Sequence, residues 1–248
     1  MRPSSWLVPD WPAPASVRAF VTTRAGGVSR GAYASMNLAD HVGDDPRNVA
    51  ENRARLRAFL PAEPHWLRQV HGTGVYRVEG GGPREADACV CRTPAEVCVV
   101  LTADCLPVLL CDRAGQVVAA AHAGWRGLCQ GVLERTVMAM ETDPAALLAW
   151  LGPAIGPQAF QVGEEVRAAF LAHDPAAAAA FVPDEAAGQR ERWRADLYQL
   201  ARQRLARAGV QAVYGGGRCT FSEPAHFFSY RRDGATGRMA SLIWLERR

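Results

Sequence analysis

The chain has 248 residues, of which 49% are hydrophobic and 21% are charged, and its formal net charge is only +3. This length suffices for one large domain or two small ones. The sequence contains no apolar run of about 18 residues, which excludes a transmembrane helix, and its weak, dispersed positive charge argues against a nucleic-acid partner. The first residues, MRPSSWLVPDWPAP, lack the apolar core of a secretory signal, so we expect a cytoplasmic protein.

The charged and sulfur-containing residues narrow the chemistry further. Lysine is absent, so all 28 basic residues are arginine, which excludes a lysine Schiff base and a P-loop. Any fixed positive charge in a site must come from arginine, a helix N-terminus or a metal. The seven cysteines are an odd number without an export signal, which argues against a disulfide framework. Cys98, Cys111 and Cys129 have apolar neighbours and are expected in the core.

The first half of the chain is predicted to consist of strands around one helix. The helix is expected at 45–60, because Pro46 suits its first turn and Val49, Leu56 and Leu60 fall on one face. Apolar runs predict strands at 17–24, 65–72, 74–80, 96–103 and 106–112.

The second half is predicted to be richer in helices. After a turn at DRAG (112–115), we expect strands at 116–124 and 242–246, helices at 127–140, 166–173 and 196–209, and a helix with a surface loop over 174–193. Strands and helices are intermingled without a strict βαβ rhythm, and neither a repeat nor a linker divides the chain. We therefore expect one mixed α/β domain of the α+β class over residues 1–248.

Three residues at the ends of predicted strands are candidates for catalysis or metal binding: His71, Cys105 and His122. A thiolate and two imidazoles suit zinc and leave its fourth tetrahedral position open. Their spacing matches no compact zinc motif, so packing roles remain an alternative for each residue. A second functional interpretation makes Cys105 a nucleophile with His122 as its base. Asp104 could orient a ligand, although a neighbour of Cys105 on a strand would point the other way.

The stretch GWRG that follows His122 is predicted to turn from a strand into a helix. Gly124 and Gly127 would let the backbone approach a ligand, and the helix start suits an anion. Arg126 could bind an oxyanion through two parallel hydrogen bonds. The alternative is an arginine that pairs with a buried carboxylate.

Two polar segments could add substrate contacts. The segment 22–45 is long for a mere connection, and its Arg24, Ser35 and Asn37 could line a polar pocket. An ordered surface loop is the alternative. The segment 227–241 raises the same question, and a solvated charged face is its alternative; its polar candidates are Tyr230, Arg231, Arg232 and Arg238.

Taken together, these segments resemble one known family, variously called polyphenol oxidase (laccase-domain) proteins, peptidoglycan editing factors and purine nucleoside phosphorylases. The resemblance covers about residues 17–245, and ADC-P followed by HAGWRG is its most specific part. The matching segments, in order, are TTRAGGVSRGAYASMNLADHVGDD, ENR, RQVHG, ADA, TADCLPVLLCD, AAHAGWRG, LGPAIGP, DL, CT and FFSYRRDGATGRMAS.

The resemblance implies a layered α-β-β-α domain with zinc held by His71, Cys105 and His122, which are also the implied catalytic residues. Activities reported for relatives are phosphorolysis of adenosine, inosine and methylthioadenosine, and deamination of adenosine. Copper-dependent oxidation of phenols and a role in peptidoglycan editing are attached to other members. A His₂Cys set admits copper, but the chain has only six histidines in all, which is few for several copper sites.

The expected function is therefore that of a zinc-dependent purine nucleoside enzyme. It would bind a nucleoside and phosphate, with Arg126 and Arg24 on the phosphate and Ser35 and Asn37 in the substrate pocket. The alternatives are a Cys–His hydrolase or amidase acting on cell-wall material, a copper-dependent oxidase, and a non-catalytic protein that binds metal or nucleoside. Oligomeric state and preferred nucleoside are left open by the sequence.

Overall fold

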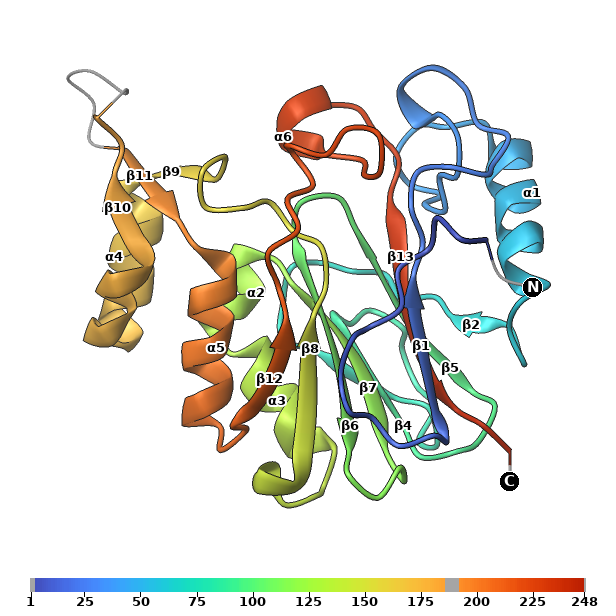
Figure 1. The fold of residues 1–248 in the computed structure, drawn as a ribbon, viewed down its shortest axis with the longest axis horizontal. Helices are drawn as coiled ribbons and strands as arrows, with labels where there is room; N and C mark the ends of the chain where they lie inside the picture. Colours follow the sequence, from blue (N-terminus) through green and yellow to red (C-terminus); the bar gives the residue numbers. More distant parts are fainter. Residues whose placement is uncertain (1–2, 186–191, 248) are drawn as a thin grey trace.

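The computed structural model describes residues 3–185 and 192–247, which fold into four layers. In Figure 1 these layers follow one another as a helix, a first sheet, a second sheet and a group of helices. The first sheet has the strand order β1 (Val17–Val21), β13 (Met239–Leu245), β5 (Val97–Thr102) and β2 (Pro64–His65). The predicted α-β-β-α arrangement of a mixed α/β fold is confirmed.

The second sheet is larger, and it includes His122, one of the three residues that the sequence singled out. Its strand order is β12 (Ala212–Gly215), β8 (Leu147–Leu151), β6 (Leu106–Asp112), β7 (Val118–Ala123), β4 (Ala88–Cys91) and β3 (Val75–Arg77). The two outermost pairs, β12–β8 and β3–β4, are parallel, whereas the inner pairs are antiparallel. A small third sheet joins β10 (Phe181–Pro183), β11 (Arg192–Ala195) and β9 (Gln161–Gly163).

Helices cover the outer face of each large sheet. The first sheet is covered by α1 (Pro46–Arg57), and the second by α2 (Trp125–Gln130), α3 (Val132–Ala139) and α5 (Leu197–Arg207). α4 (Glu164–His173) packs beside the small sheet, and α6 (Tyr230–Asp233) lies at the site end. Short 3₁₀ turns occupy Gly31–Tyr33, Pro144–Ala146 and Pro175–Ala180. Within the described chain, none of the helices has the length and apolar character of a membrane span.

Strand alternation divides the core into separate layers. In β5, Val97 and Val99 pack toward α1, whereas Cys98 and Val100 pack between the two sheets. Because both faces of such a strand are buried, its sequence is a continuous apolar run. All seven cysteines are free, and those expected in the core are buried. Cys89 and Cys91 also fill the core between the sheets.

One predicted strand is wrong for a reason that bears on the site. The segment 65–72 was expected to be a strand, but only Pro64–His65 pairs in a sheet. The backbone N–H groups of Val70, His71 and Gly72 are instead bonded by the side chain of Asp87. Side-chain capping of this kind competes with a regular ladder.

Two helix predictions also need correction. The helix expected at 127–140 begins at Trp125 and breaks at Gly131, whose φ of 99° is left-handed, so it forms α2 and α3. In the segment 174–193, the expected helix is a 3₁₀ helix, and strand β10 follows it. The expected surface loop cannot be placed, because residues 186–191 lie outside the described chain. The sequence also did not predict the strands β4, β8, β9, β11 and β12.

The N-terminal loop is held in place by one buried amide, that of Asn52 on α1. Its Nδ2 lies 2.9 Å from Ser29 Oγ, 3.1 Å from the Ser35 carbonyl and 2.8 Å from the Asn37 carbonyl. Its Oδ1 accepts a hydrogen bond from the Val28 N–H at 2.9 Å. The long polar segment is therefore an ordered wall of the molecule, as one of the two interpretations expected.

Replacing Asn52 by alanine should destabilise the protein, because several buried polar groups of the loop lose their partner. We expect Asn52→Ala to lower the free energy of unfolding by about 3 kcal/mol. The matched control is Asn48→Ala on the same helix, where the half-buried side chain makes no hydrogen bond to any described residue. Denaturant titration compares them, and an equal loss in both variants would contradict the role of Asn52.

Candidate metal centre

The fold brings together the three residues that the sequence singled out. His71 lies in the loop before β3, Cys105 in the bend between β5 and β6, and His122 near the end of β7. Their possible ligand atoms all lie within 4.8 Å of one another. The Cys105 Sγ is 3.8 Å from His71 Nε2, and the two imidazole rings meet edge to face with centroids 4.8 Å apart.

The direction of His122 follows from strand alternation in β7. Ala119, Ala121 and Ala123 pack toward the helices, whereas Val118 and Ala120 pack between the sheets. His122 shares the parity of the second group, because side chains two residues apart lie on the same face. Its imidazole therefore lies at the end of the space between the two sheets.

Asp87 fixes the orientation of both histidines. Its Oδ1 lies 2.8 Å from His122 Nδ1, which leaves His122 Nε2 free to face the thiol. The same carboxylate accepts the backbone N–H groups of Val70, His71 and Gly72 at 3.2, 2.9 and 2.7 Å. These bonds hold the His71 backbone in a left-handed conformation with φ 59°. Carboxylates that orient ligand imidazoles in this way are typical of metal sites.

Two glycines of GWRG allow the close approach of these groups. A Cβ added to Gly124 would lie 2.9 Å from His71 Cδ2 and 3.0 Å from Cys105 Sγ. A Cβ added to Gly127 would lie 2.6 Å from the carbonyl oxygen of Gly72. The glycines thus make room for the ligand side chains and for the loop that carries His71.

The electrostatics of the site favour a thiolate. Burial would raise the pKa of Cys105, but the charge and hydrogen bonding of His122, with those of His71, lower it to about 6. For His122, burial acts to lower the pKa, but the thiolate and Asp87 raise it to about 9. Hydrogen bonds from His122 and the backbone likewise keep the pKa of Asp87 low against its burial. A thiolate is the form of cysteine that binds metals.

The donor set fits a transition metal. One thiolate and two imidazoles would fill three tetrahedral positions of zinc and leave one position open. Copper accepts the same set of ligands. The fit rests on three features: the convergence of the donor atoms, the oriented Nε2 of His122, and the space that Gly124 leaves beside them.

A cavity of about 380 Å³ opens beside these residues and contains an arginine. The Arg238 guanidinium donates to the carbonyls of Thr236 and Gly237 and forms no ion pair with any described residue. It is therefore a cation available to an anionic ligand. Besides the three metal-binding candidates, the lining consists of His41, Gln69, Leu101, Thr102, Ala103, Tyr230 and Arg238.

The four predicted substrate contacts are not in the lining of this cavity. Arg24 donates to the carbonyls of Ala34 and Pro224. Ser35 Oγ accepts the Gly27 N–H and donates to the Arg24 carbonyl. Arg126 is exposed, with its guanidinium carbon 4.5 Å from the centroid of the Trp125 ring.

Asn37, the fourth predicted contact, touches the cavity only through Arg238. It is fully buried, and its Oδ1 accepts the Arg238 backbone N–H at 3.0 Å. Its amide nitrogen donates to the Ala39 carbonyl and to Asp44. Asn37 therefore positions the residue that does line the cavity.

Asp104 does not orient a metal ligand. Its carboxylate accepts the Thr220 hydroxyl and the Arg231 backbone N–H, both at 2.6 Å. These bonds anchor α6, so that Tyr230 can line the cavity. Arg232 is engaged by Asp233 and by backbone carbonyls. The orienting role suggested for Asp104 belongs instead to Asp87, which the sequence marked only by its short ADA motif.

Adding one methyl group at Gly124 should disrupt the metal centre without unfolding the protein. We expect Gly124→Ala to lose at least tenfold in zinc affinity, because its Cβ would displace His71 or Cys105. Gly80→Ala is the control, since a Cβ there makes only ordinary contacts with Arg77. Chelator competition measures affinity and circular dichroism checks the fold. Unchanged affinity in Gly124→Ala would count against the proposed ligand set.

The sequence of this chain matches a known family and several of its members. A family model described as multi-copper polyphenol oxidoreductase laccase matches residues 18–246. The purine nucleoside phosphorylase YfiH of Escherichia coli is 56% identical over 246 residues, with 98% of this chain and 99% of that protein covered. A purine nucleoside phosphorylase of Pseudomonas aeruginosa is also 56% identical, over 243 residues, with the same shares covered.

Solved structures agree with these sequence matches. Neisseria meningitidis protein NMB0706 superposes with a TM-score of 0.91 at 53% identity, covering 98% of this chain and all 100% of the other. YlmD from Geobacillus stearothermophilus superposes with a TM-score of 0.85 at 31% identity, covering 100% of this chain and 98% of the other. The chain therefore belongs to the family described as multi-copper polyphenol oxidoreductase laccase, together with these YfiH-type relatives.

Proposed function

We propose that this protein is a zinc-dependent purine nucleoside phosphorylase. The observation that carries the proposal is the cavity in which His71, Cys105 and His122 meet an arginine without a carboxylate partner. A phosphorolytic enzyme needs a site for an anion next to its reacting centre, and in a chain without lysine this cation is arginine. The names of relatives that are 56% identical support the same activity.

In this proposal each group has a definite task. Phosphate oxygen forms a bond to the anomeric carbon of the ribose while the bond from that carbon to the purine breaks. Arg238 holds phosphate through its guanidinium, and Tyr230 forms a wall beside the sugar. His71, Cys105 and His122 hold the metal, and Asp87 keeps the two imidazoles oriented. A bound zinc would supply Lewis-acid polarisation and accept a polar atom of the substrate in its open position.

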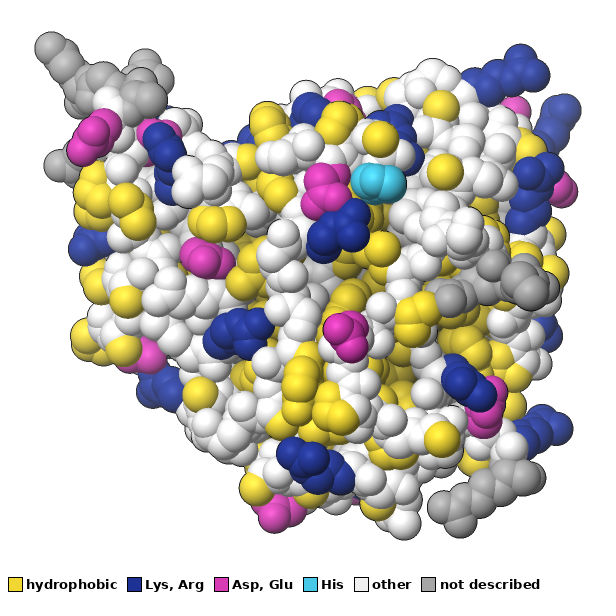
Figure 2. Space-filling model, in the orientation of Figure 1, with side chains coloured by type: hydrophobic (Ala, Val, Ile, Leu, Met, Phe, Trp, Pro, Cys, Tyr) yellow, Lys and Arg dark blue, Asp and Glu magenta, His cyan; other side chains and the backbone are white. Residues whose placement is uncertain are grey.

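The substrates we propose are adenosine, inosine and methylthioadenosine, with deamination of adenosine as a secondary activity. An open position on zinc suits both reactions. The seven free cysteines fit a reducing compartment, so we propose that the enzyme acts in the cytoplasm. Oxidation of phenols by several coppers is a weaker candidate, because the described residues contain one cluster of metal-binding geometry, not several. On the face drawn in Figure 2, arginine side chains lie scattered among acidic ones, which gives no nucleic-acid footprint there.

The proposal is tested by incubating the purified protein with adenosine and phosphate and separating the products by chromatography. We expect adenine and ribose 1-phosphate, whose formation stops in Cys105→Ser because that variant loses the thiolate ligand. Release of inosine without phosphate consumption would assign deamination as the main activity instead. If neither product forms with zinc-loaded protein, the enzyme proposal fails.

The assignment of phosphate to Arg238 has its own test. Arg238→Lys keeps the charge but loses the planar fork, so the KM for phosphate should rise about tenfold or more while metal content is unchanged. Arg126→Lys is the matched comparison, because the sequence pointed to Arg126. If only Arg126→Lys raises the KM for phosphate, phosphate binds at the start of α2, and the assignment to Arg238 is wrong.

The contact between the thiol and two imidazoles also favours a second candidate, a Cys–His hydrolase with Cys105 as nucleophile. Thiol labelling separates the two. As a zinc ligand, Cys105 should react slowly with iodoacetamide in the metallated protein and faster after chelation, which should also abolish turnover. Fast labelling of fully metallated protein, with activity that survives chelators, would instead support the nucleophile.

A further inference from the structure

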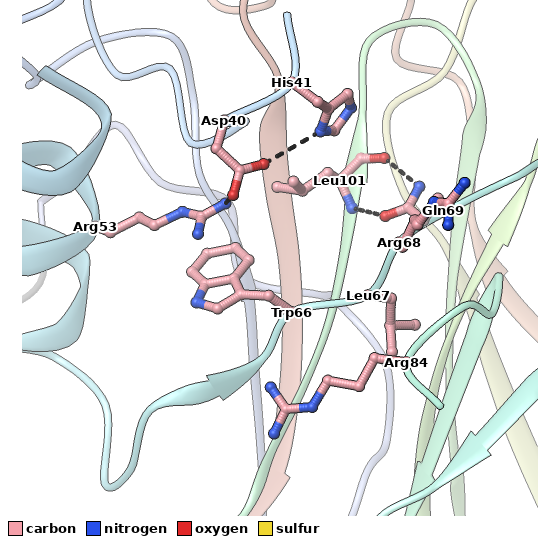
Figure 3. A pocket seen from close by; sticks show the side chains of 9 residues that line it. All are labelled: Asp40, His41, Arg53, Trp66, Leu67, Arg68, Gln69, Arg84 and Leu101. Carbon is pink, nitrogen blue, oxygen red and sulfur yellow. Dashed lines mark hydrogen bonds and ion pairs between the residues drawn. The ribbon is translucent and has the colours of Figure 1, made fainter. Parts of the chain in front are cut away.

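A second cavity, drawn in Figure 3, adjoins the metal cavity. It measures about 530 Å³, and His41, Gln69 and Leu101 line both cavities. The side chain of Gln69 is tied to the end of β5, because it bonds both the N–H and the carbonyl of Leu101. The two spaces are therefore neighbouring compartments with a fixed border.

The second cavity is cationic. Arg53, Arg68 and Arg84 belong to its lining, against the single carboxylate of Asp40. Arg53 is engaged, since it contacts Asp40 at 3.3 Å and donates to the Leu38 carbonyl. A cleft lined by an excess of one charge concentrates ligands of the opposite charge.

Two of these arginines are available to a ligand. The Arg84 side chain forms no hydrogen bond or ion pair with any described residue, and its guanidinium stands 5.8 Å from the centroid of the Tyr76 ring. Arg68 pairs with Glu85 at 3.0 Å, but its side chain is 79% exposed, so this pair is weak. Guanidinium groups bind phosphate oxygens through paired, charge-assisted hydrogen bonds.

An aromatic and apolar wall accompanies these charges. The Trp66 indole lies in the lining with Leu67 and Leu101, and Arg53 stacks on it with its guanidinium carbon 4.2 Å from the ring centroid. Figure 3 shows Trp66 on the same side of the cavity as Arg53. The lining of this cavity therefore combines an aromatic and apolar surface with the guanidinium groups.

We propose that this second cavity binds the phosphate of a nucleoside 5′-monophosphate whose nucleoside part occupies the metal cavity. The inference rests on the proposed function, because that function places a nucleoside beside His71, Cys105 and His122. A 5′ substituent on the sugar can extend into a neighbouring compartment, and the excess of arginine there matches a phosphate. The protein therefore binds nucleotides in addition to nucleosides.

The test compares adenosine 5′-monophosphate, adenosine and inorganic phosphate by calorimetry on the zinc-loaded protein at low salt. We expect the nucleotide to bind at least tenfold more tightly than adenosine. In the double variant Arg68→Gln/Arg84→Gln this advantage should disappear, while adenosine affinity stays unchanged. Arg47→Gln, an exposed arginine on α1 outside both cavities, is the control and should behave like the wild type.

The outcomes separate this inference from the proposed function. Equal affinity for nucleotide and adenosine in the wild type, or an advantage that survives in the double variant, would overturn the inference alone. A double variant with raised phosphate KM and intact nucleotide binding would overturn it too, because the cavity would then hold the co-substrate. Wild-type protein that fails to convert adenosine and phosphate to products would refute the proposed function itself.

Discussion

The geometry of the candidate metal centre depends on the carboxylate of Asp87. It is fully buried directly before the start of β4, where it accepts three backbone N–H groups of the loop that carries His71 and contacts the imidazole of His122. A buried carboxylate is costly unless such bonds satisfy it. Here the satisfied carboxylate couples a loop to a strand, so two candidate ligands from distant parts of the chain share one anchor.

The two large sheets supply the rest of the arrangement. Because their facing sides are filled by small and apolar residues such as Ala120 and Cys89, the polar group His122 is confined to the rim, where that core ends. Cys105 lies in the bend that joins a strand of one sheet, β5, to a strand of the other, β6. The site is therefore a product of how the sheets stack, and the absence of a Cβ at Gly124 lets its groups approach.

Local patterns could predict most elements but only part of the site. Apolar runs located β5, β6 and β7, and Pro46 with its amphipathic pattern located α1, since these signals lie within one element. The three metal-binding candidates emerged from strand ends and from the family resemblance. Asp87 was missed because its partners lie 15 to 35 positions away in the chain. The sequence analysis assigned phosphate binding to Arg126, not Arg238, because of the glycines and the helix start around Arg126. Such local features do not reveal which guanidinium points into a cavity.

The alternation in β7 has a consequence for how this family can vary. A shift of one residue along a strand exchanges its two faces. In β7 that shift would turn His122 toward the helices and place Ala121 or Ala123 at the rim. An insertion or deletion of one residue within β7 would therefore disrupt the candidate metal centre. Insertions and deletions should be tolerated in segments such as the Asp112–Gly115 turn. This turn is far from the rim, because it closes the opposite end of the β6–β7 hairpin.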